Sequence, residues 1–392
     1  MFKVLTLNNI AVEGLRHLPR ERYEVASEIA HPDAILVRSY KMHDMEIPDT
    51  VAAIGRAGAG TNNIPVDAMT ARGVPVFNAP GANANAVKEL AIAGMLMGAR
   101  NLCNARDYVK SLAETGDALN KAVEAGKKQF VGFELPGKTL GVIGLGAIGV
   151  EVANAALDLG MKVVGFDPAI TVKNAWQLSS GVEQEETLDQ LFMHADYVTV
   201  HVPLLDATRN LINESRIQLM KDGGVLINFA RGGVVDDGAA LAALDSGKLH
   251  AFITDFPTPE LIANSKVVAL PHLGASTGEA ESNCAIMVAE NVKDYLENGN
   301  VRFSVNFPKA ILSRLDAWRL TVANANVPNM VGQISTCIAN AGLNIEDLLN
   351  KSVGEFAYTI VDVNADPSDA LLAELRAIDG VLNLRNLGKP VT

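Results

Sequence analysis

The 392-residue chain has little cysteine and no long apolar segment. Its three cysteines, Cys103, Cys284 and Cys337, form no CxxC pair. This pattern excludes a disulfide framework and a zinc knuckle, favours a reducing compartment and predicts no metal site. No run of about 18 uninterrupted apolar residues occurs, and the start MFKVLTLNN is typical of a first strand rather than a signal peptide. We therefore expect a cytoplasmic protein.

Positive charge is also scarce. The chain has 33 Lys and Arg against 45 Asp and Glu, a net charge of -12. A field of this sign repels polyanions, which disfavours nonspecific binding to nucleic acid or to an anionic membrane. An anionic substrate therefore requires local arginines.

What the sequence does contain is a regular alternation of short apolar runs with helical patterns. The runs expected to be strands are residues 2–7, 34–37, 51–54, 74–77, 139–143, 163–166, 197–200, 225–228, 251–254 and 267–270. This alternation predicts an α/β protein with parallel sheets and crossover helices. The length allows two or three domains of about 100–200 residues each.

Two further stretches depart from this alternation. An apolar helical stretch, 86–102, continues into a polar helical stretch that reaches Lys128, and together they are expected to bridge two lobes. Beyond residue 308 the expected order is strand, helix, strand, strand, helix, strand, over 320–323, 330–341, 345–351, 356–363, 368–378 and 381–384. That order is the ferredoxin-like split βαβ motif, so a separate C-terminal domain is predicted.

The segment TLGVIGLGAIG, residues 139–149, joins a buried-strand run to three glycines with the spacing GxGxxG. Gly144 permits a tight strand-to-helix turn, Gly146 lets phosphates approach the backbone, and Gly149 lets the new helix pack on the sheet. A pyrophosphate is expected on the amides of Ala147 and Ile148, at the positive end of the helix dipole.

Asp167 ends the strand that follows this helix, about 20 residues beyond the glycines. A carboxylate there accepts hydrogen bonds from the ribose hydroxyls and repels a 2'-phosphate. The sequence therefore predicts NAD as the cofactor, in preference to NADP. The alternative is a glycine turn that binds no ligand.

The neighbouring motifs resemble the D-isomer-specific 2-hydroxyacid dehydrogenase family over nearly all of residues 34–307. The residues that carry the resemblance are GRAGAG (55–60), NAPGAN (78–83), Glu89, HVPL (201–204), NFARGGVVD (228–236) and PHLGAST (271–277). The family's architecture implies a Rossmann cofactor lobe, residues 99–275, inserted in a flavodoxin-like substrate lobe, residues 1–98 and 276–306. Both lobes are doubly wound parallel sheets, and residues 316–392 resemble a ferredoxin-like ACT domain, a module that commonly binds amino acids.

Oxidation of a 2-hydroxy acid requires a base for the hydroxyl proton, and histidine suits this role because its proton affinity lies near working pH. His272 follows a predicted strand, and the family motif makes it the catalytic base. The family pairs this histidine with a carboxylate, which fixes the tautomer. Here the sequence departs from the family's acid-then-proline ending, because Glu260 comes after the second proline. We expect Glu260 to be the partner and Asp255 to be the reserve.

Arg231 follows the strand 225–228, and its planar guanidinium matches a carboxylate bidentately. The resemblance makes Arg231 a catalytic residue that also binds the substrate, together with His272 and with the amides of Ala57 and Gly58. It further implies a set of cofactor contacts, which are His201, Val202, Pro203, Thr208, Ala230, Asp255 and Gly274. A structural role in a turn or a loop is the alternative for each residue.

Two features indicate the substrate and a regulator. Arg38 and Ser39 end a strand at the place where the phosphoglycerate dehydrogenases of this family bind the substrate phosphate. The C-terminal module resembles their serine-binding domains, with Asn326 and Asn344 at the matching positions. An amide both donates to a carboxylate and accepts from an ammonium group. Asn329 stands where a glycine is more familiar.

The resemblance thus implies NAD-dependent oxidation of D-3-phosphoglycerate to 3-phosphohydroxypyruvate, the first step of L-serine biosynthesis, with L-serine as an effector. One alternative is a hydroxypyruvate, glyoxylate or other 2-hydroxyacid reductase. Another is an NAD-sensing protein like the corepressors that share this fold. A homo-oligomer is expected, either a dimer or a tetramer, with no nucleic-acid or membrane partner.

Overall fold

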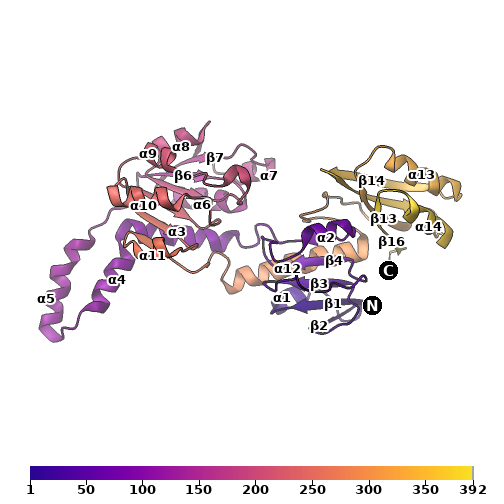
Figure 1. Ribbon diagram of the computed structural model, residues 1–392, viewed down its shortest axis with the longest axis horizontal. Coiled ribbons are helices and arrows are strands. Elements are labelled where there is room, and N and C mark those ends of the chain that lie inside the picture. Colours follow the sequence, from indigo (N-terminus) through magenta and orange to yellow (C-terminus); the bar gives the residue numbers. More distant parts are fainter. Residues whose placement is uncertain (391–392) are drawn as a thin grey trace. The chain divides into compact units, whose positions relative to one another are not determined.

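The computed structural model describes residues 1–390, which divide into two compact units. The first unit contains Met1–Ala82 and the residues from Glu281 onward, and the second contains Asn83–Ala280. Each crossing between the units lies at the start of a helix, α3 (Ala84–Arg100) or α12 (Gly278–Asn298), both labelled in Figure 1.

The first boundary between the units lies before α3, at residues 82 and 83. The sequence analysis placed it between residues 98 and 99, near the end of this helix. Gly94 and Gly98 bring α3 close to the sheet of the second unit, where a Cβ atom on either glycine would lie 3.0 Å from a side-chain atom of Phe229 or Ile253. The second boundary follows Ala280 instead of residue 275. Small residues along α3 therefore assign the whole helix to the second unit.

The first unit contains a parallel sheet of five strands in the order β2-β1-β3-β4-β5. Its strands are β1 (Phe2–Leu7), β2 (Tyr23–Ala26), β3 (Ala34–Val37), β4 (Ala53–Arg56) and β5 (Val76–Phe77). Helix α12 packs on one face, together with the short α1 (Val12–Leu15), and α2 (Val66–Ala71) packs on the other. All four side chains of β3 are buried, as a strand covered on both faces requires.

The second unit contains a parallel sheet of seven strands in the order β12-β11-β10-β9-β6-β7-β8. Its strands are β6 (Thr139–Ile143), β7 (Lys162–Phe166), β8 (Val182–Gln184), β9 (Tyr197–Val200), β10 (Gly224–Asn228), β11 (Leu249–Thr254) and β12 (Val267–Ala269). The strand order reverses between β6 and β9, so the carboxyl ends of these strands form the switch point where such sheets bind ligands.

Helices cover both faces of this sheet and create two apolar cores. Helices α3 and α6 (Ala147–Asp158) cover one face, and α8 (Leu188–His194), α9 (Glu214–Leu219) and α10 (Asp237–Ser246) cover the other. The expected doubly wound architecture is confirmed. Short helices complete the unit: α7 (Val172–Gln177), α11 (Pro259–Ala263) and the 3-10 turns η1 (Lys127–Phe130) and η2 (Asp206–Thr208).

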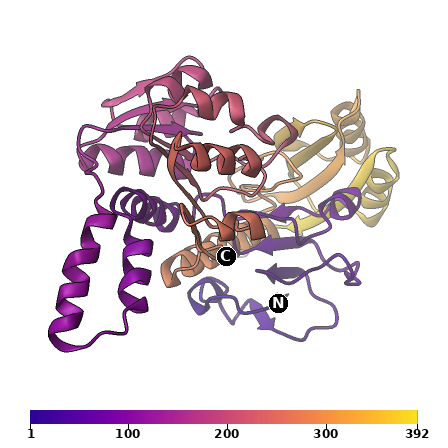
Figure 2. The ribbon, with the colours of Figure 1, turned by 60° about the vertical axis from the view of Figure 1, so that its left-hand side comes forward.

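A helical hairpin projects from the second unit (Figures 1 and 2). It consists of α4 (Leu102–Ser111) and α5 (Gly116–Gly126), and every residue of α4 is at least partly exposed. The expectation that this polar stretch helps to bridge two lobes is wrong, because the chain turns back and returns to β6. Across residues 1–390, no helix combines the length and the hydropathy needed to cross a bilayer.

The C-terminal segment forms the predicted ferredoxin-like module. Its elements are β13 (Trp318–Ala325), α13 (Met330–Asn340), β14 (Ile345–Val353), β15 (Phe356–Val363), α14 (Asp369–Ala377) and β16 (Val381–Gly388). The antiparallel sheet has the order β14-β15-β13-β16. Helices α13 and α14 pack on one face, and the opposite face joins the apolar core around α12.

Polar side chains of this sheet bind the C-terminal end of α12. The guanidinium of Arg319 is fully buried, pairs with both oxygens of Asp362 at 2.6 Å and donates to the carbonyl of Asn298 at 3.1 Å. Arg385 donates to the carbonyls of Tyr295 and Leu296, both at 3.0 Å. Carbonyls at a helix C-terminus lack donors within the helix. Here the C-terminal module supplies donors from its arginine side chains.

Candidate active site

The glycine loop joins β6 to α6 and meets a separate steric requirement at each glycine. Gly144 has a φ of 89°, and a Cβ atom there would lie 2.8 Å from the carbonyl oxygen of His201. A Cβ atom on Gly149 would lie 1.9 Å from the carbonyl oxygen of Gly144. The Cβ position of Gly146 faces open space, which leaves room for a ligand to approach the backbone.

The N-terminus of α6 has the properties of a phosphate site. Gly146 is its N-cap residue, and no side chain in the described part of the chain caps the helix. The amides of Ala147 and Ile148 belong to the first turn, where backbone N–H groups lack partners within the helix. The helix dipole favours an anion at this end. The uncapped turn and the space over Gly146 therefore fit the pyrophosphate of NAD.

Asp167 follows β7 and lies beside this loop. Its Oδ2 accepts the amide of Leu145 at 2.8 Å, and its Oδ1 accepts the amide of Ala169 at 2.8 Å. Because each carboxylate oxygen can accept a further hydrogen bond, the group remains available to ribose hydroxyls. This position suits the predicted ribose contact.

His201 follows β9 and contacts the glycine loop through its backbone. Burial lowers the pKa of its imidazole to about 4, because it penalises the charged form. Its Nε2 lies 3.0 Å from Oγ1 of Thr199, while its buried Nδ1 has no partner within residues 1–390. A neutral imidazole with a buried nitrogen left over is suited to contact with a cofactor, as predicted, and not to proton transfer near neutral pH.

The residues after His201 form a tight loop that is fixed by Thr208. The Thr208 hydroxyl donates to the carbonyl of Pro203 at 2.6 Å and accepts the amide of Leu205 at 2.7 Å. Val202 lies against the glycine loop, 2.8 Å from the Cβ position of Gly144. The cofactor contacts of Val202 and Pro203 stay a prediction, and the Thr208 hydroxyl stabilises the loop.

Asp255 follows β11 and is almost fully buried, with 1% of its surface exposed. Its Oδ2 accepts the amides of Leu273 at 2.9 Å and Gly274 at 3.2 Å. Burial raises the pKa of this carboxyl, while the charge of a protonated His272 and the backbone hydrogen bonds lower it. Its Oδ1 is buried without a partner in the described chain, and an unpaired acceptor fits the amide group of a nicotinamide.

His272 lies three residues beyond the end of β12, on an exposed loop. The expected pairing of its ring with Glu260 is not formed, since no hydrogen bond or ion pair joins these two side chains among the residues that the structure describes. Glu260 is exposed in the first turn of α11, and its charge raises the pKa of Asp237 instead. The side chain that contacts the imidazole is Phe256, with ring centroids 4.8 Å apart.

Arg231 lies in the turn after β10, and Asn228 holds this turn at two points. The Asn228 amide donates to the carbonyl of Arg231 at 2.9 Å, and its oxygen accepts the amide of Ala230 at 3.1 Å. Sequence reasoning missed Asn228, although a polar residue that ends an apolar strand was a signal for it. The Arg231 guanidinium donates to the carbonyl of Ala230 at 2.7 Å.

In the first unit, Arg38 follows β3 and already binds a carboxylate. Its Nη2 lies 2.5 Å from Oε1 of Glu281, in the first turns of α12. The amide of Ser39 donates to Oδ1 of Asn8 at 3.2 Å. Arg56 ends the neighbouring strand β4 and donates from Nε to the carbonyl of Arg38 at 3.1 Å. Two arginines and one carboxylate therefore meet at the ends of adjacent strands.

The amides of Ala57 and Gly58, which were predicted to bind the substrate, already have backbone partners. The Ala57 amide donates to the carbonyl of Val37 at 2.8 Å, and the Gly58 amide donates to the carbonyl of Arg56 at 2.8 Å. The next two amides, of Ala59 and Gly60, make no hydrogen bond within residues 1–390. Amides without a partner are suited to bind an anion.

Asn83 is a second polar residue that sequence reasoning missed. It is the N-cap residue of α3, but its side chain does not cap the helix. Its Oδ1 is buried and unpaired in the described structure. Its position after the NAP turn, at the start of a helix, was the available signal.

In the C-terminal module both predicted effector amides make local hydrogen bonds. Asn326 donates to the carbonyl of Gly354 at 3.0 Å, and Asn344 donates to Oε1 of Glu346 at 3.3 Å. Asn324, only 1% exposed, carries a buried oxygen without a partner in the described residues. Asn329 adopts a φ of 66°, the conformation that a glycine takes readily.

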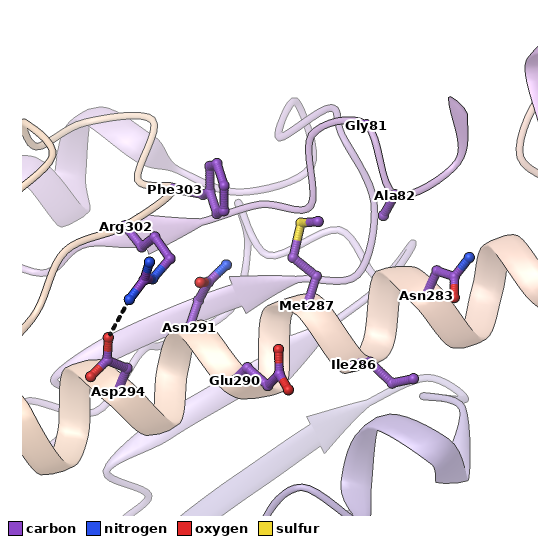
Figure 3. Close-up of a pocket in the computed structure, with 10 residues that line it drawn as sticks. All are labelled: Gly81, Ala82, Asn283, Ile286, Met287, Glu290, Asn291, Asp294, Arg302 and Phe303. Atoms are coloured by element: carbon purple, nitrogen blue, oxygen red, sulfur yellow. Dashed lines mark hydrogen bonds and ion pairs between the residues drawn. The ribbon is translucent and has the colours of Figure 1, made fainter. Parts of the chain in front are cut away.

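A depression of about 720 Å³ lies along α12 in the first unit (Figure 3). It is lined by α12 residues such as Met287 and Asn291, by Arg302 and Phe303, and by the loop at Gly81. None of the predicted site residues lines it. The predicted site residues therefore lie outside this depression, at strand ends and in the loops that follow them.

A doubly wound sheet with this glycine loop defines a dinucleotide-binding enzyme fold. Residues 92–275 match the NAD binding domain of the D-isomer-specific 2-hydroxyacid dehydrogenases. A D-3-phosphoglycerate dehydrogenase of Haemophilus influenzae is 34% identical over 88% of this chain and 83% of its own length. The D-3-phosphoglycerate dehydrogenase of Methanocaldococcus jannaschii is 36% identical over 87% of this chain, which spans only 63% of that relative.

A solved structure shows the same fold. NAD⁺-bound 3-phosphoglycerate dehydrogenase of Entamoeba histolytica has a TM-score of 0.59 at 27% identity, over 78% of this chain and 98% of that one. The chain therefore belongs to the D-isomer-specific 2-hydroxyacid dehydrogenase family, and residues 92–275 form its NAD-binding domain.

Proposed function

We propose that this protein oxidises D-3-phosphoglycerate to 3-phosphohydroxypyruvate with NAD. The relatives named above carry the name of this activity. The observation that carries the proposal is the position of Arg38 at the end of β3, beside Arg56 at the end of β4, where a substrate phosphate can meet guanidinium groups. In a chain with a net charge of -12, a phosphorylated substrate requires such a local cation.

The proposed chemistry divides between a cofactor and this chain's own side chains. Bound NAD supplies the acceptor for the hydride that leaves C2 of the substrate. His272 takes the proton from the hydroxyl oxygen on C2, so that the electron pair of the O–H bond forms the C=O bond as the hydride leaves. Arg231 binds the substrate carboxylate through two parallel hydrogen bonds. In the reverse direction the protonated His272 returns its proton.

Residues of the second unit hold the cofactor in this proposal. The amides of Ala147 and Ile148 bind the pyrophosphate, and Asp167 accepts from the ribose hydroxyls. The unpaired oxygen of Asp255 accepts from the carboxamide. The backbone around Ala230 and Gly274, together with His201, completes the contacts.

The assay is NADH formation from D-3-phosphoglycerate, with glyoxylate and hydroxypyruvate reduction measured in parallel. The proposal expects turnover with phosphoglycerate. Turnover of glyoxylate or hydroxypyruvate without phosphoglycerate oxidation would contradict it. That second candidate, a reductase of unphosphorylated 2-keto acids, is favoured by Glu281, which neutralises Arg38. Arg38→Ala separates the two, because loss of a phosphate contact raises KM for phosphoglycerate and leaves glyoxylate little changed.

We also propose that L-serine binds the C-terminal module and lowers turnover. The unpaired oxygen of Asn324 supports this, since it lies next to the loop of Asn326 and can accept from an ammonium group. Asn344 would exchange its weak contact with Glu346 for the effector. Turnover with and without L-serine tests the proposal, with Asn326→Ala as the insensitive variant. Equal inhibition of the variant and the parent would contradict the assigned site.

A further inference from the structure

The peptide group between Arg38 and Ser39 is fixed at both of its ends. Its carbonyl oxygen accepts from Nε of Arg56 at 3.1 Å and from Nδ2 of Asn63 at 3.4 Å. Its N–H group donates to Oδ1 of Asn8 at 3.2 Å. Because the carbonyl and N–H groups of a trans peptide point in opposite directions, the peptide plane cannot rotate without loss of one of these hydrogen bonds. The backbone that carries Arg38 is therefore set by side chains from three other segments.

Asn63 makes further contacts with the same turn. Its side chain is 9% exposed, and its Nδ2 also donates to the carbonyl of Tyr40 at 2.8 Å. Its own carbonyl accepts the amide of Met42, whose side chain is fully buried, at 2.8 Å. Residues 38–42 are thus joined at three points to the loop that follows β4. Removal of the Asn63 side chain would release the turn that follows Arg38.

Asn8 follows β1 in a backbone conformation that few residue types adopt. Its φ is 68°, in the left-handed region that asparagine and glycine tolerate best. Leu7 pairs with Val37 in the sheet, which brings the side chain of Asn8 within reach of the Ser39 amide. Because Asn8 is exposed, a substitution by glycine would keep the backbone conformation and remove only the acceptor.

These two asparagines act on the residue that the proposed function places at the substrate phosphate. Arg38 follows β3 at the carboxyl edge of the sheet, where parallel sheets bind ligands. A guanidinium loses rotamer freedom when it binds an anion, and a fixed backbone limits the further entropic cost. Building on the proposed function, we propose that Asn63 and Asn8 are positioning residues of Arg38. They hold its backbone in the conformation that presents the guanidinium to the phosphate.

Steady-state kinetics of the full-length protein test this role. Asn63→Ala is expected to raise KM for D-3-phosphoglycerate about fivefold to thirtyfold, because hydrogen bonds to two carbonyls are lost. Asn8→Gly should raise it about twofold to fivefold, since a single exposed hydrogen bond is lost. In both variants kcat and the KM values for NAD and glyoxylate should stay within about twofold of the parent values. A fall in kcat with KM for phosphoglycerate unchanged would overturn the proposal.

The matched control is Asn62→Ala. Asn62 is exposed next to Asn63, and its side chain makes no hydrogen bond within residues 1–390, although its carbonyl contacts the ring of His43. This variant should keep the parent's KM for phosphoglycerate. An increase equal to that of Asn63→Ala would show that any change in this loop weakens substrate binding, which contradicts a specific role for Asn63.

Hydrogen exchange of the protein without substrate supplies a second readout. The Ser39 amide should exchange faster in Asn8→Gly, and the amides of residues 39–42 should exchange faster in Asn63→Ala, while β1 and β3 keep their parent rates. Unchanged exchange at residues 39–42 in both variants would overturn the proposal, and Asn8→Gly decides alone if Asn63→Ala does not fold. If the parent oxidises no phosphoglycerate, the substrate proposal is wrong, and hydrogen exchange still decides whether the asparagines position Arg38.

Discussion

In the proposed function, the substrate phosphate competes with the carboxylate of Glu281 for the guanidinium of Arg38. The two side chains are 36% and 40% exposed, and exposed ion pairs are worth about 0.2–1 kcal/mol. Glu281→Gln removes this competition, so KM for D-3-phosphoglycerate should fall about two- to fivefold. Steady-state kinetics with phosphoglycerate and glyoxylate measure the effect.

The control for this prediction is Glu279→Gln, which removes the same charge from the same turn of α12 without an ion pair in the described residues. It should leave KM close to the parent value. A rise in KM in Glu281→Gln would show that Glu281 orients Arg38 rather than competing for it.

His201 makes the stability of the second unit depend on pH. Above an unfolded pKa of 6.5 both states are neutral, so the residue contributes nothing there. As the pH falls below 6.5, His201 binds a proton in the unfolded state, whereas in the folded state it stays neutral until about pH 4. The folded state therefore loses up to about 3 kcal/mol across this window. Urea unfolding of the parent and His201→Gln at several pH values measures it.

The two proteins should show a constant difference in unfolding free energy above pH 6.5 and a shift in favour of His201→Gln below it. If the difference in unfolding free energy stayed constant down to about pH 4.5, the imidazole could not be buried in its neutral form.

At the scale of single residues, the sequence predicted best those residues whose roles depend on local backbone conformation. Gly144, Gly146 and Gly149 have the conformations and contacts that their spacing implied, because a tight turn imposes them locally. The pairing of Glu260 with His272 stays a prediction, since it depends on the direction in which two exposed loops leave the sheet. The partners of the Ala57 and Gly58 amides could not be predicted, because they are set by the local course of the backbone after β4.

At the scale of elements, the hairpin of α4 and α5 carries apolar side chains that are about half exposed. Leu102 is 48% exposed and Val109 is 51% exposed, on a helix that projects from its unit (Figure 2). The homo-oligomer expected from the sequence needs an apolar surface that two copies of this chain can share. The exposed side chains of α4 are a candidate for that surface.

The test of this surface is Leu102→Asp with Val109→Asp. The double variant should have about half the parent mass in light scattering coupled to size exclusion, because two buried charges oppose association. Val172→Asp, at an apolar residue 74% exposed on α7, is the matched control and should keep the parent mass. An unchanged mass in the double variant would exclude the hairpin as the interface.

Most elements could be predicted, and those that could not are short. The helices and strands of the C-terminal module were expected within a few residues of their bounds, because apolar periodicity is strong there. Strands β2 and β8 were missed, since they lie at sheet edges and expose polar side chains such as Glu24 and Glu183. An edge strand buries too little to leave an apolar run in the sequence.

At the scale of the whole molecule, the C-terminal module is part of the core of the first unit. Its sheet shares the apolar cluster around Val292, Tyr295 and Leu296 with α12. Arg319 joins them, with five hydrogen bonds to Asp362 and to carbonyls of Asn298, Leu312 and Ser313. We therefore expect residues that the sequence separates into two domains to unfold together.

Arg319→Met should lower the free energy of unfolding by about 3–5 kcal/mol, because it leaves the buried Asp362 and three carbonyls without a donor. Denaturant unfolding measures the loss. Arg302→Met is the matched control, since Arg302 pairs with Asp294 at 3.4 Å on a surface where such pairs contribute about 1 kcal/mol at most. Equal losses of unfolding free energy in the two variants would contradict the proposed role of Arg319 in joining the module to α12.

In the proposed function, His272 transfers the proton during NAD-dependent oxidation of D-3-phosphoglycerate. The most direct measurement is the rate of NADH formation from phosphoglycerate by His272→Ala and by the parent, with NAD affinity measured separately. We expect the rate of His272→Ala to be at least about a hundredfold lower, with NAD affinity retained. Turnover equal to that of the parent would contradict it.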